Sequence, residues 1–139
     1  MQFLTYEALQ QYWTGDFFAA NVVISVNLLG ALLLGMLVGY ERAYHGRAAG
    51  MRTYGLVCMA STALTVFVGY SHFWYGGAAT TAIPDATRVV QGIVTGIGFL
   101  CGGVILKDGL SISGLTTAAS LWAASAIGVL MGVGFYGAA

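Results

Sequence analysis

Four long apolar stretches set the pattern of this chain, and every charged residue lies outside them. The stretches cover residues 22–40, 53–71, 89–106 and 115–136. Each has 18 to 22 residues, and about 20 residues of α-helix span a hydrocarbon core of about 30 Å. A segment that crosses a bilayer must satisfy its backbone hydrogen bonds internally, so we expect transmembrane helices. The pattern predicts an all-α membrane protein, a Gly-rich and tightly packed bundle of about four transmembrane helices.

The first 21 residues differ from these stretches. They carry Glu7 and Asp16 but no Lys or Arg, whereas a signal peptide needs a positively charged start. They are also rich in aromatic side chains, which favour the membrane interface. We therefore predict an interfacial N-terminal segment over residues 1–21 and a transmembrane domain over residues 22–139. A disordered N-terminus is the alternative.

The basic residues predict an orientation in the membrane. The loop over residues 41–52 holds three arginines and the loop over residues 107–114 holds Lys107, whereas the long loop over residues 72–88 holds only Arg88. Short loops rich in Lys and Arg face the cytoplasm. We expect loops 41–52 and 107–114 to be cytoplasmic, with both termini and the long loop outside.

The composition agrees with a membrane location. Of the 139 residues, 58% are hydrophobic and 7% are charged, against roughly 25% charged residues in a soluble domain. The apolar composition makes the lipid bilayer the expected partner. The formal net charge is zero, so we expect no binding to nucleic acid. Cys58 and Cys101 lie within apolar stretches, which predicts buried packing thiols rather than a disulfide framework or a zinc site.

Glycines recur at four-residue spacing inside the predicted helices, where residues four apart share a face. Small residues on one face let two membrane helices approach closely. The expected packing positions are Gly35, Gly39, Gly96, Gly98, Gly102, Gly128 and Gly132. The third stretch carries glycine on more than one face, which predicts a central place in the bundle. The alternative is that glycine marks flexible or broken helix.

Polar residues at the helix ends and in one span form a short list of candidates. Glu41 ends the first stretch and Arg52 begins the second, so we expect them to form a cytoplasmic polar cluster. Asp85 precedes the third stretch, where it can cap the helix and pair with Arg88. Interfacial anchoring is the alternative for all four. Asn27 lies within the first stretch, and we expect a hydrogen-bond partner on another helix; pore lining is the alternative.

Signals for catalysis and metal binding are weak. The sequence has no HExxH motif and no glycine loop that ends in Lys-Ser or Lys-Thr. His45 and His72 lie on opposite sides in the predicted topology, which argues against a Ser-His-Asp triad. Glu41 and His45 are too few for a metal site. We predict no enzymatic activity and no cofactor, and metal ligands stay unassigned.

Five motifs in register resemble the MgtC/SapB family of bacterial inner-membrane proteins over roughly residues 22–136. They are Gly39-Tyr40-Glu41-Arg42, Ala49-Gly50-Met51-Arg52-Thr53, Asp85-Ala86-Thr87-Arg88-Val89, Thr95-Gly96-Ile97-Gly98-Phe99-Leu100, and the run from Gly114 through Thr116, Thr117 and Ser120 to Trp122. The resemblance carries over the polar residues Glu41, Arg42, Arg52, Thr53, Asp85, Arg88, Thr116 and Thr117, without a role for each.

The chain departs from the family pattern in three places. Cys101-Gly102-Gly103 replaces the usual Gly-Ala-Gly. Gln91 follows Arg88 by three residues, where the family has a glutamine after four, so its role is not transferred. Many members continue into a further span and a soluble domain, whereas this sequence ends at Ala139. We expect a member that consists of the membrane domain.

The resemblance implies two functions. The first is a regulatory or accessory protein of the inner (cell) membrane in magnesium homeostasis and low-magnesium growth, from a virulence-associated family, that docks its helices onto another complex such as ATP synthase. The second is a transporter or channel for Mg²⁺ or another cation. Mg²⁺ prefers oxygen ligands, and no predicted span contains an acidic residue. A homo-oligomer could ring Glu41 or Asp85 around an axis.

Overall fold

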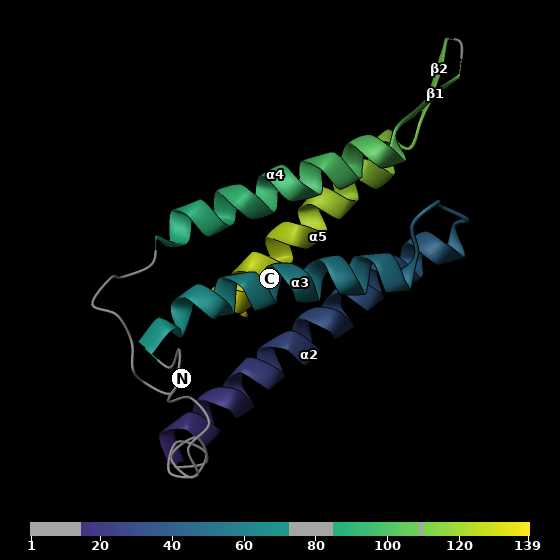
Figure 1. The fold of residues 1–139 in the computed structure, drawn as a ribbon. Helices are drawn as coiled ribbons and strands as arrows, with labels where there is room; N and C mark the ends of the chain where they lie inside the picture. Colours follow the sequence, from purple (N-terminus) through teal and green to yellow (C-terminus); the bar gives the residue numbers. More distant parts are fainter. Residues whose placement is uncertain (1–14, 73–84, 109) are drawn as a thin grey trace, which may run out of the picture.

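The computed structural model describes residues 15–72, 85–108 and 110–139. In these ranges it contains four helices, α2 (Gly15–Tyr44), α3 (Met51–Gly69), α4 (Ala86–Val104) and α5 (Leu115–Val133), and a hairpin of β1 (Leu106–Asp108) and β2 (Ser111–Ser113) (Figure 1). All four helices are long and apolar enough to cross a membrane. The prediction of an all-α bundle with about four transmembrane helices is therefore confirmed.

Helix α2 is longer than the other three helices. Its 30 residues extend over about 45 Å, whereas a hydrocarbon core is about 30 Å thick. It begins at Gly15, so residues 15–21, which are predicted to be interfacial, are part of the same helix as the first apolar stretch. Asp16 lies in the first turn and Arg42 in the last, where the helix dipole favours each charge. Residues 1–14 of the predicted interfacial segment lie outside the described residues.

Helix α3 is the centre of the bundle. It packs against α2, α5 and α4, whereas α4 lies at the edge and packs mainly against α5 (Figure 1). The prediction that the third stretch is central is therefore wrong. The buried residues of α4 are Ile93, Ile97 and Cys101, which are four apart and form one narrow stripe. The apolar pattern could not reveal this, because the lipid-facing residues of a membrane helix are as apolar as the buried ones.

Glycines bring α2 and α3 into close contact. A Cβ atom added at Gly35 would lie 2.5 Å from the carbonyl oxygen of Tyr54. One added at Gly39 would lie 2.5 Å from the Cα of Met51. Both neighbours are backbone atoms, so neither position accepts a larger residue unless the helices separate.

The contact between α3 and α5 is equally close. A Cβ atom at Gly128 would overlap the carbonyl oxygen of Cys58, and one at Gly132 would lie 2.6 Å from the Cβ of Thr65. Cys58 and Cys101 are both buried and free, so the prediction of packing thiols is confirmed. Small residues on α5 thus let the backbones of the two helices approach.

Candidate functional site

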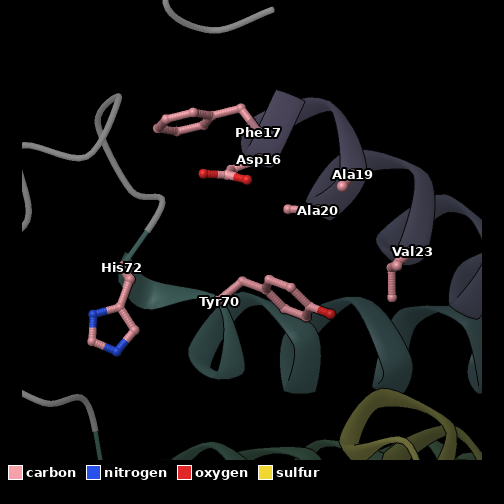
Figure 2. Close-up of a pocket in the computed structure, with 7 residues that line it drawn as sticks. All are labelled: Asp16, Phe17, Ala19, Ala20, Val23, Tyr70 and His72. Carbon is pink, nitrogen blue, oxygen red and sulfur yellow. The ribbon is translucent and has the colours of Figure 1, made fainter. Parts of the chain in front are cut away.

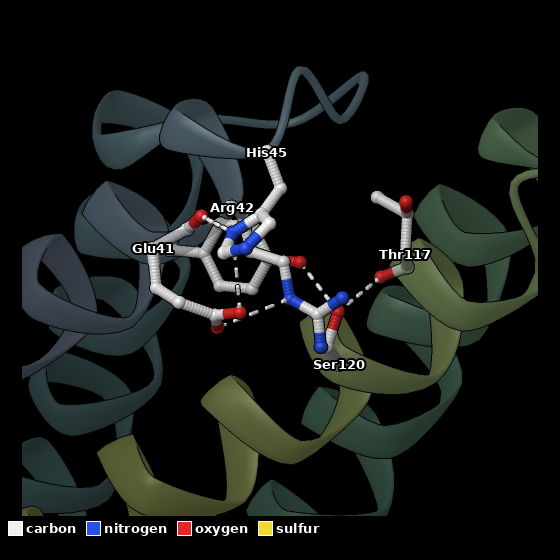
Figure 3. A network of polar contacts seen from close by, with 6 residues as sticks. Glu41, Arg42, His45, Thr117 and Ser120 are labelled. Atoms are coloured by element: carbon white, nitrogen blue, oxygen red, sulfur yellow. Dashed lines mark hydrogen bonds and ion pairs between the residues drawn. The ribbon is translucent and has the colours of Figure 1, made fainter.

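A cluster of polar side chains lies where α2 ends and α5 begins. Figure 3 shows Arg42 of α2 between Glu41 and the α5 residues Thr117 and Ser120. The side chain of Arg42 is 21% exposed and that of Glu41 is 61% exposed. Nε of Arg42 lies 3.8 Å from a carboxylate oxygen of Glu41 and is buried without a hydrogen-bond partner in the described part of the chain. This arginine therefore carries its charge into the contact between the helices.

Glu41 faces its own helix rather than Arg52. Its carboxylate lies 3.6 Å from Nδ1 of His45, one turn along the chain, and Nδ1 is 2.8 Å from the Glu41 carbonyl oxygen. Between described residues, Glu41 and Arg52 form no ion pair, and the Arg52 side chain is exposed. The expected pair of Glu41 with Arg52 is thus replaced by contacts with Arg42 and His45. The reason is proximity along the chain, because Arg42 is the next residue and His45, just past the end of α2, lies four positions away.

Tyr54 of α3 joins this polar cluster through a hydrogen bond with Ser120. It is completely buried, and its hydroxyl lies 2.5 Å from Oγ of Ser120. Ser120 in turn donates a hydrogen bond to the carbonyl oxygen of Thr117, at 3.0 Å. Thr117 is buried and Thr53 half-buried, whereas Thr116 is exposed. The motif residues therefore do not all converge: Arg42 and Thr117 do, and Arg52 and Thr116 face outward.

The contact between α3 and α5 contains three hydrogen bonds that we call the polar ladder. The first is the Tyr54–Ser120 pair. One turn further along both helices, Sγ of Cys58 donates to the carbonyl oxygen of Ala124, at 3.0 Å. Oγ1 of Thr62 donates to the carbonyl oxygen of Gly128, at 2.7 Å. The ladder is not among the features predicted from the sequence. The signal was the four-residue spacing of Tyr54, Cys58 and Thr62 within an apolar stretch.

The opposite end of the bundle carries Asp85 and Arg88 as a pair. Asp85 accepts hydrogen bonds from the backbone N–H and the hydroxyl of Thr87, at 2.9 Å and 2.6 Å. Nε of Arg88 lies 3.5 Å from the other carboxylate oxygen. The hydroxyl of Thr87, followed by its backbone N–H, lowers the pKa of Asp85 below its usual value. Asp85 therefore caps α4 as a charged group.

Asn27 is buried inside the bundle and has a partner from a distant part of the chain. The hydroxyl of Tyr136 donates to its Oδ1 at 2.7 Å. Tyr136 follows the end of α5, so this bond ties the C-terminal residues to α2. Asn27 thus contacts the protein interior rather than an open path.

A glycine-rich surface on α4, which we call the α4 glycine face, has no neighbour in the described part of the chain. A Cβ atom added at any of its glycines would meet nothing within 4 Å. At 100° per residue, its members lie on both flanks of the buried stripe. They are Gly92, Gly96, Gly98, Gly102 and Gly103. Gly96, Gly98 and Gly102 therefore do not pack against another described helix of this chain, in contrast to the expectation from their spacing.

No metal site is formed by the described residues. Nowhere in those ranges do three His, Cys, Asp or Glu side chains approach closely enough to hold an ion. Glu41 and Asp85 lie at opposite ends of the bundle (Figure 1). Between those ends, the buried side chains of Asn27, Thr62 and Ser125 are hydrogen-bonded within the protein.

The comparisons with known proteins agree with these motifs. A model of the MgtC family matches residues 28–139, which is most of the chain. The chain belongs to the MgtC family. This result confirms the resemblance, and with four membrane-crossing helices it identifies a multi-pass membrane protein.

Two curated relatives show how much of a family member the chain covers. It is 45% identical over 109 residues to Protein MgtC of Salmonella typhimurium (strain 14028s / SGSC 2262), covering 78% of this chain and 43% of that protein. It is 43% identical over 107 residues to Protein MgtC of Brucella abortus (strain 2308), covering 77% and 41%. The chain thus spans less than half the length of these relatives. No solved structure matches.

Proposed function

We propose that this protein is a non-catalytic regulatory or accessory protein of the bacterial inner membrane that supports adaptation to low magnesium. The link to magnesium rests on membership of the MgtC family. We propose further that α4 docks against a helix of a different membrane complex. The observation that carries this proposal is the unoccupied α4 glycine face.

The α4 glycine face is suited to a helix that approaches from outside the chain. Glycine lowers helix stability, and a Cβ atom at any of the five α4 glycines would meet no described neighbour within 4 Å, so no contact inside the described chain requires glycine there. In a membrane, glycine faces let helix backbones come close and gain van der Waals contact. Phe99 lies between the two flanks and is 87% exposed, which provides a large side chain for the contact.

The interior of the bundle favours a regulator over a conduit. The ladder residues Cys58 and Thr62 donate to backbone carbonyl oxygens of α5, so these groups satisfy one another. Mg²⁺ keeps several waters and binds through oxygen ligands, which requires a polar cavity. The second candidate, a cation transporter or channel, would need several copies to enclose such a path. ATP synthase is one candidate complex for docking, on the family resemblance alone.

The proposal is tested by filling the α4 glycine face. Gly96→Leu should abolish growth support at low magnesium in a strain without its own copy, while the melting temperature and protein level stay unchanged. The matched control is Ala123→Leu, which adds a leucine at an exposed position of α5 and should retain growth support. Equal growth with Gly96→Leu would remove the docking role.

Ion flux separates the two candidate functions. Purified parent protein in liposomes should carry Mg²⁺ at the rate of empty liposomes. A clear flux that is lost in Glu41→Gln would contradict the regulatory function and support the transporter.

A further inference from the structure

A hollow opens between the first turns of α2 and the end of α3, at the end of the bundle opposite Arg42. Its volume is about 560 Å³, within the range of about 300–1,000 Å³ that is usual for small-molecule sites. Figure 2 shows Asp16 and Ala20 on one side and Tyr70 on the other, with His72 beyond Tyr70. The lining also includes Phe17, Ala19 and Val23.

The helix lengths place this hollow at the depth of the lipid head groups. About 20 residues of helix cross the hydrocarbon core, and α2 has 30. Counted from its charged end at Glu41, residues 15–20 of α2 lie beyond the core. Helix α3 ends at Gly69, so Tyr70 and His72 lie just past it. Aromatic rings such as that of Tyr70 favour this depth.

The hollow combines groups that complement a zwitterion. The Asp16 carboxylate attracts a cation, and the rings of Phe17 and Tyr70 add to that attraction. The imidazole of His72 can donate a hydrogen bond to an anion. In the described ranges Asp16 and His72 form no ion pair, so both can bind a ligand. The methyl groups of Ala20 and Val23 add an apolar wall.

We propose that this hollow binds the phosphoethanolamine head group of a membrane phospholipid. The ammonium lies on Asp16, the phosphate accepts a hydrogen bond from His72, and an acyl chain continues along Ala20 and Val23. A lipid fits because the helix beside the hollow carries exposed apolar residues, Phe18 and Val22, 54% and 45% exposed. An ammonium donates N–H hydrogen bonds to a carboxylate, which a choline group cannot do.

Thermal unfolding of the purified chain in detergent tests this proposal. Short-chain phosphatidylethanolamine, phosphatidylcholine and phosphatidylglycerol are added in turn, and the affinity is read from the shift in melting temperature. We expect the ethanolamine lipid to bind about tenfold more tightly than the other two, as a charge-assisted hydrogen bond requires. Equal affinities, or a preference for choline or glycerol lipid, would overturn the proposal.

Two pocket variants, one control variant and one competitor make the test specific. Asp16→Asn should lose the preference for ethanolamine lipid, whereas Asp85→Asn, a matched carboxylate at the same end of the bundle, should keep it. Ala19→Trp fills the hollow and should also abolish the preference, which decides the case if Asp16→Asn does not fold. A preference that persists in either pocket variant contradicts the proposal. Displacement of the lipid by an equal concentration of soluble phosphoethanolamine would identify a free solute rather than a lipid as the ligand.

Discussion

The contact between α3 and α5 and the α4 glycine face are both built from small residues four positions apart, and their surroundings differ. On α5, the space beside Gly128 is filled by the backbone of Cys58. On α4, the space beside Gly96 and Gly98 contains no described atom within 4 Å. The four-residue spacing therefore indicates a helix face that another helix can approach closely. The spacing alone does not say whether that second helix belongs to the same chain.

The two regions also differ in their polar groups. The α3–α5 contact carries hydrogen bonds from Cys58 and Thr62 across to α5. On α4, the hydroxyl of Thr95 bonds to the carbonyl oxygen of Gln91 in its own helix, at 2.8 Å. Unlike the hydroxyl of Thr62, this hydroxyl has no hydrogen-bond partner on a second described helix. Contacts within the chain thus stabilise the first region, while the second is available to other molecules.

Replacing one glycine in each region should give the largest difference in the free energy of unfolding. Gly128→Ala should lower the free energy of unfolding by about 1–3 kcal/mol, because its Cβ would overlap the Cys58 carbonyl oxygen. Gly96→Ala should leave it unchanged or raise it by up to about 1 kcal/mol, since alanine favours helix. Unfolding in mixed detergent micelles measures both. Equal losses would show that α4 is packed as tightly as α5.

Removing one side-chain hydroxyl in each region should give a smaller difference in the free energy of unfolding. Thr62→Val keeps the shape of the side chain but deletes the bond to Gly128, and should cost about 0.6–2 kcal/mol, the range for hydrogen bonds between membrane helices. Thr95→Val, the control, should change the free energy of unfolding by less, because its bond stays within α4. The same micelle assay applies. An unchanged Thr62→Val would mean that packing alone joins α3 and α5.

The smallest effect should come from the cap of α4. The Thr87 hydroxyl is the main cause of the lowered pKa of Asp85, so Thr87→Val should move this pKa back toward its usual value of 3.8. Because the pKa of Asp85 is lower in the folded state, the charged cap stabilises the protein at neutral pH. This stability is lost as the pH falls below 3.8 and through the lowered folded-state pKa. NMR titration of the Asp85 carboxyl carbon measures the shift. Thr116→Val is the control and should not move it.

The sequence predicts the membrane helices well because their signal is local. Residues 53–71 and 115–136 were expected to span the membrane, and α3 and α5 occupy most of these ranges. Which faces of these helices are buried does not follow from the local sequence. Gly128, for example, is enclosed by the backbone of Cys58, which lies more than 50 residues away in the chain, whereas no described residue encloses Gly98. For this reason the third stretch was wrongly placed at the centre.

The candidate sites follow the same division. The pair of Asp85 with Arg88 lies within one turn and follows from the sequence. The α5 neighbours of Arg42 could not be predicted, because Thr117 and Ser120 come from a helix that is distant in the sequence. The sequence predicts a pair of Glu41 with Arg52 across a loop, but Arg42 and His45 lie nearer in the chain and contact the same carboxylate.

The polar ladder has a consequence for how α3 and α5 align. Two of its acceptors are backbone oxygens, at Ala124 and Gly128, and every residue offers such an oxygen. If α5 slid by one turn, about 5.4 Å, so that Gly132 took the place of Gly128, no Cβ would overlap α3 at this point and Cys58 and Thr62 would meet equivalent oxygens. The Tyr54 hydroxyl would instead lose Ser120, the one side-chain acceptor of the ladder. Tyr54 therefore selects the observed alignment over this shifted one, and Ala124→Ser would give the two helices two alignments of similar energy.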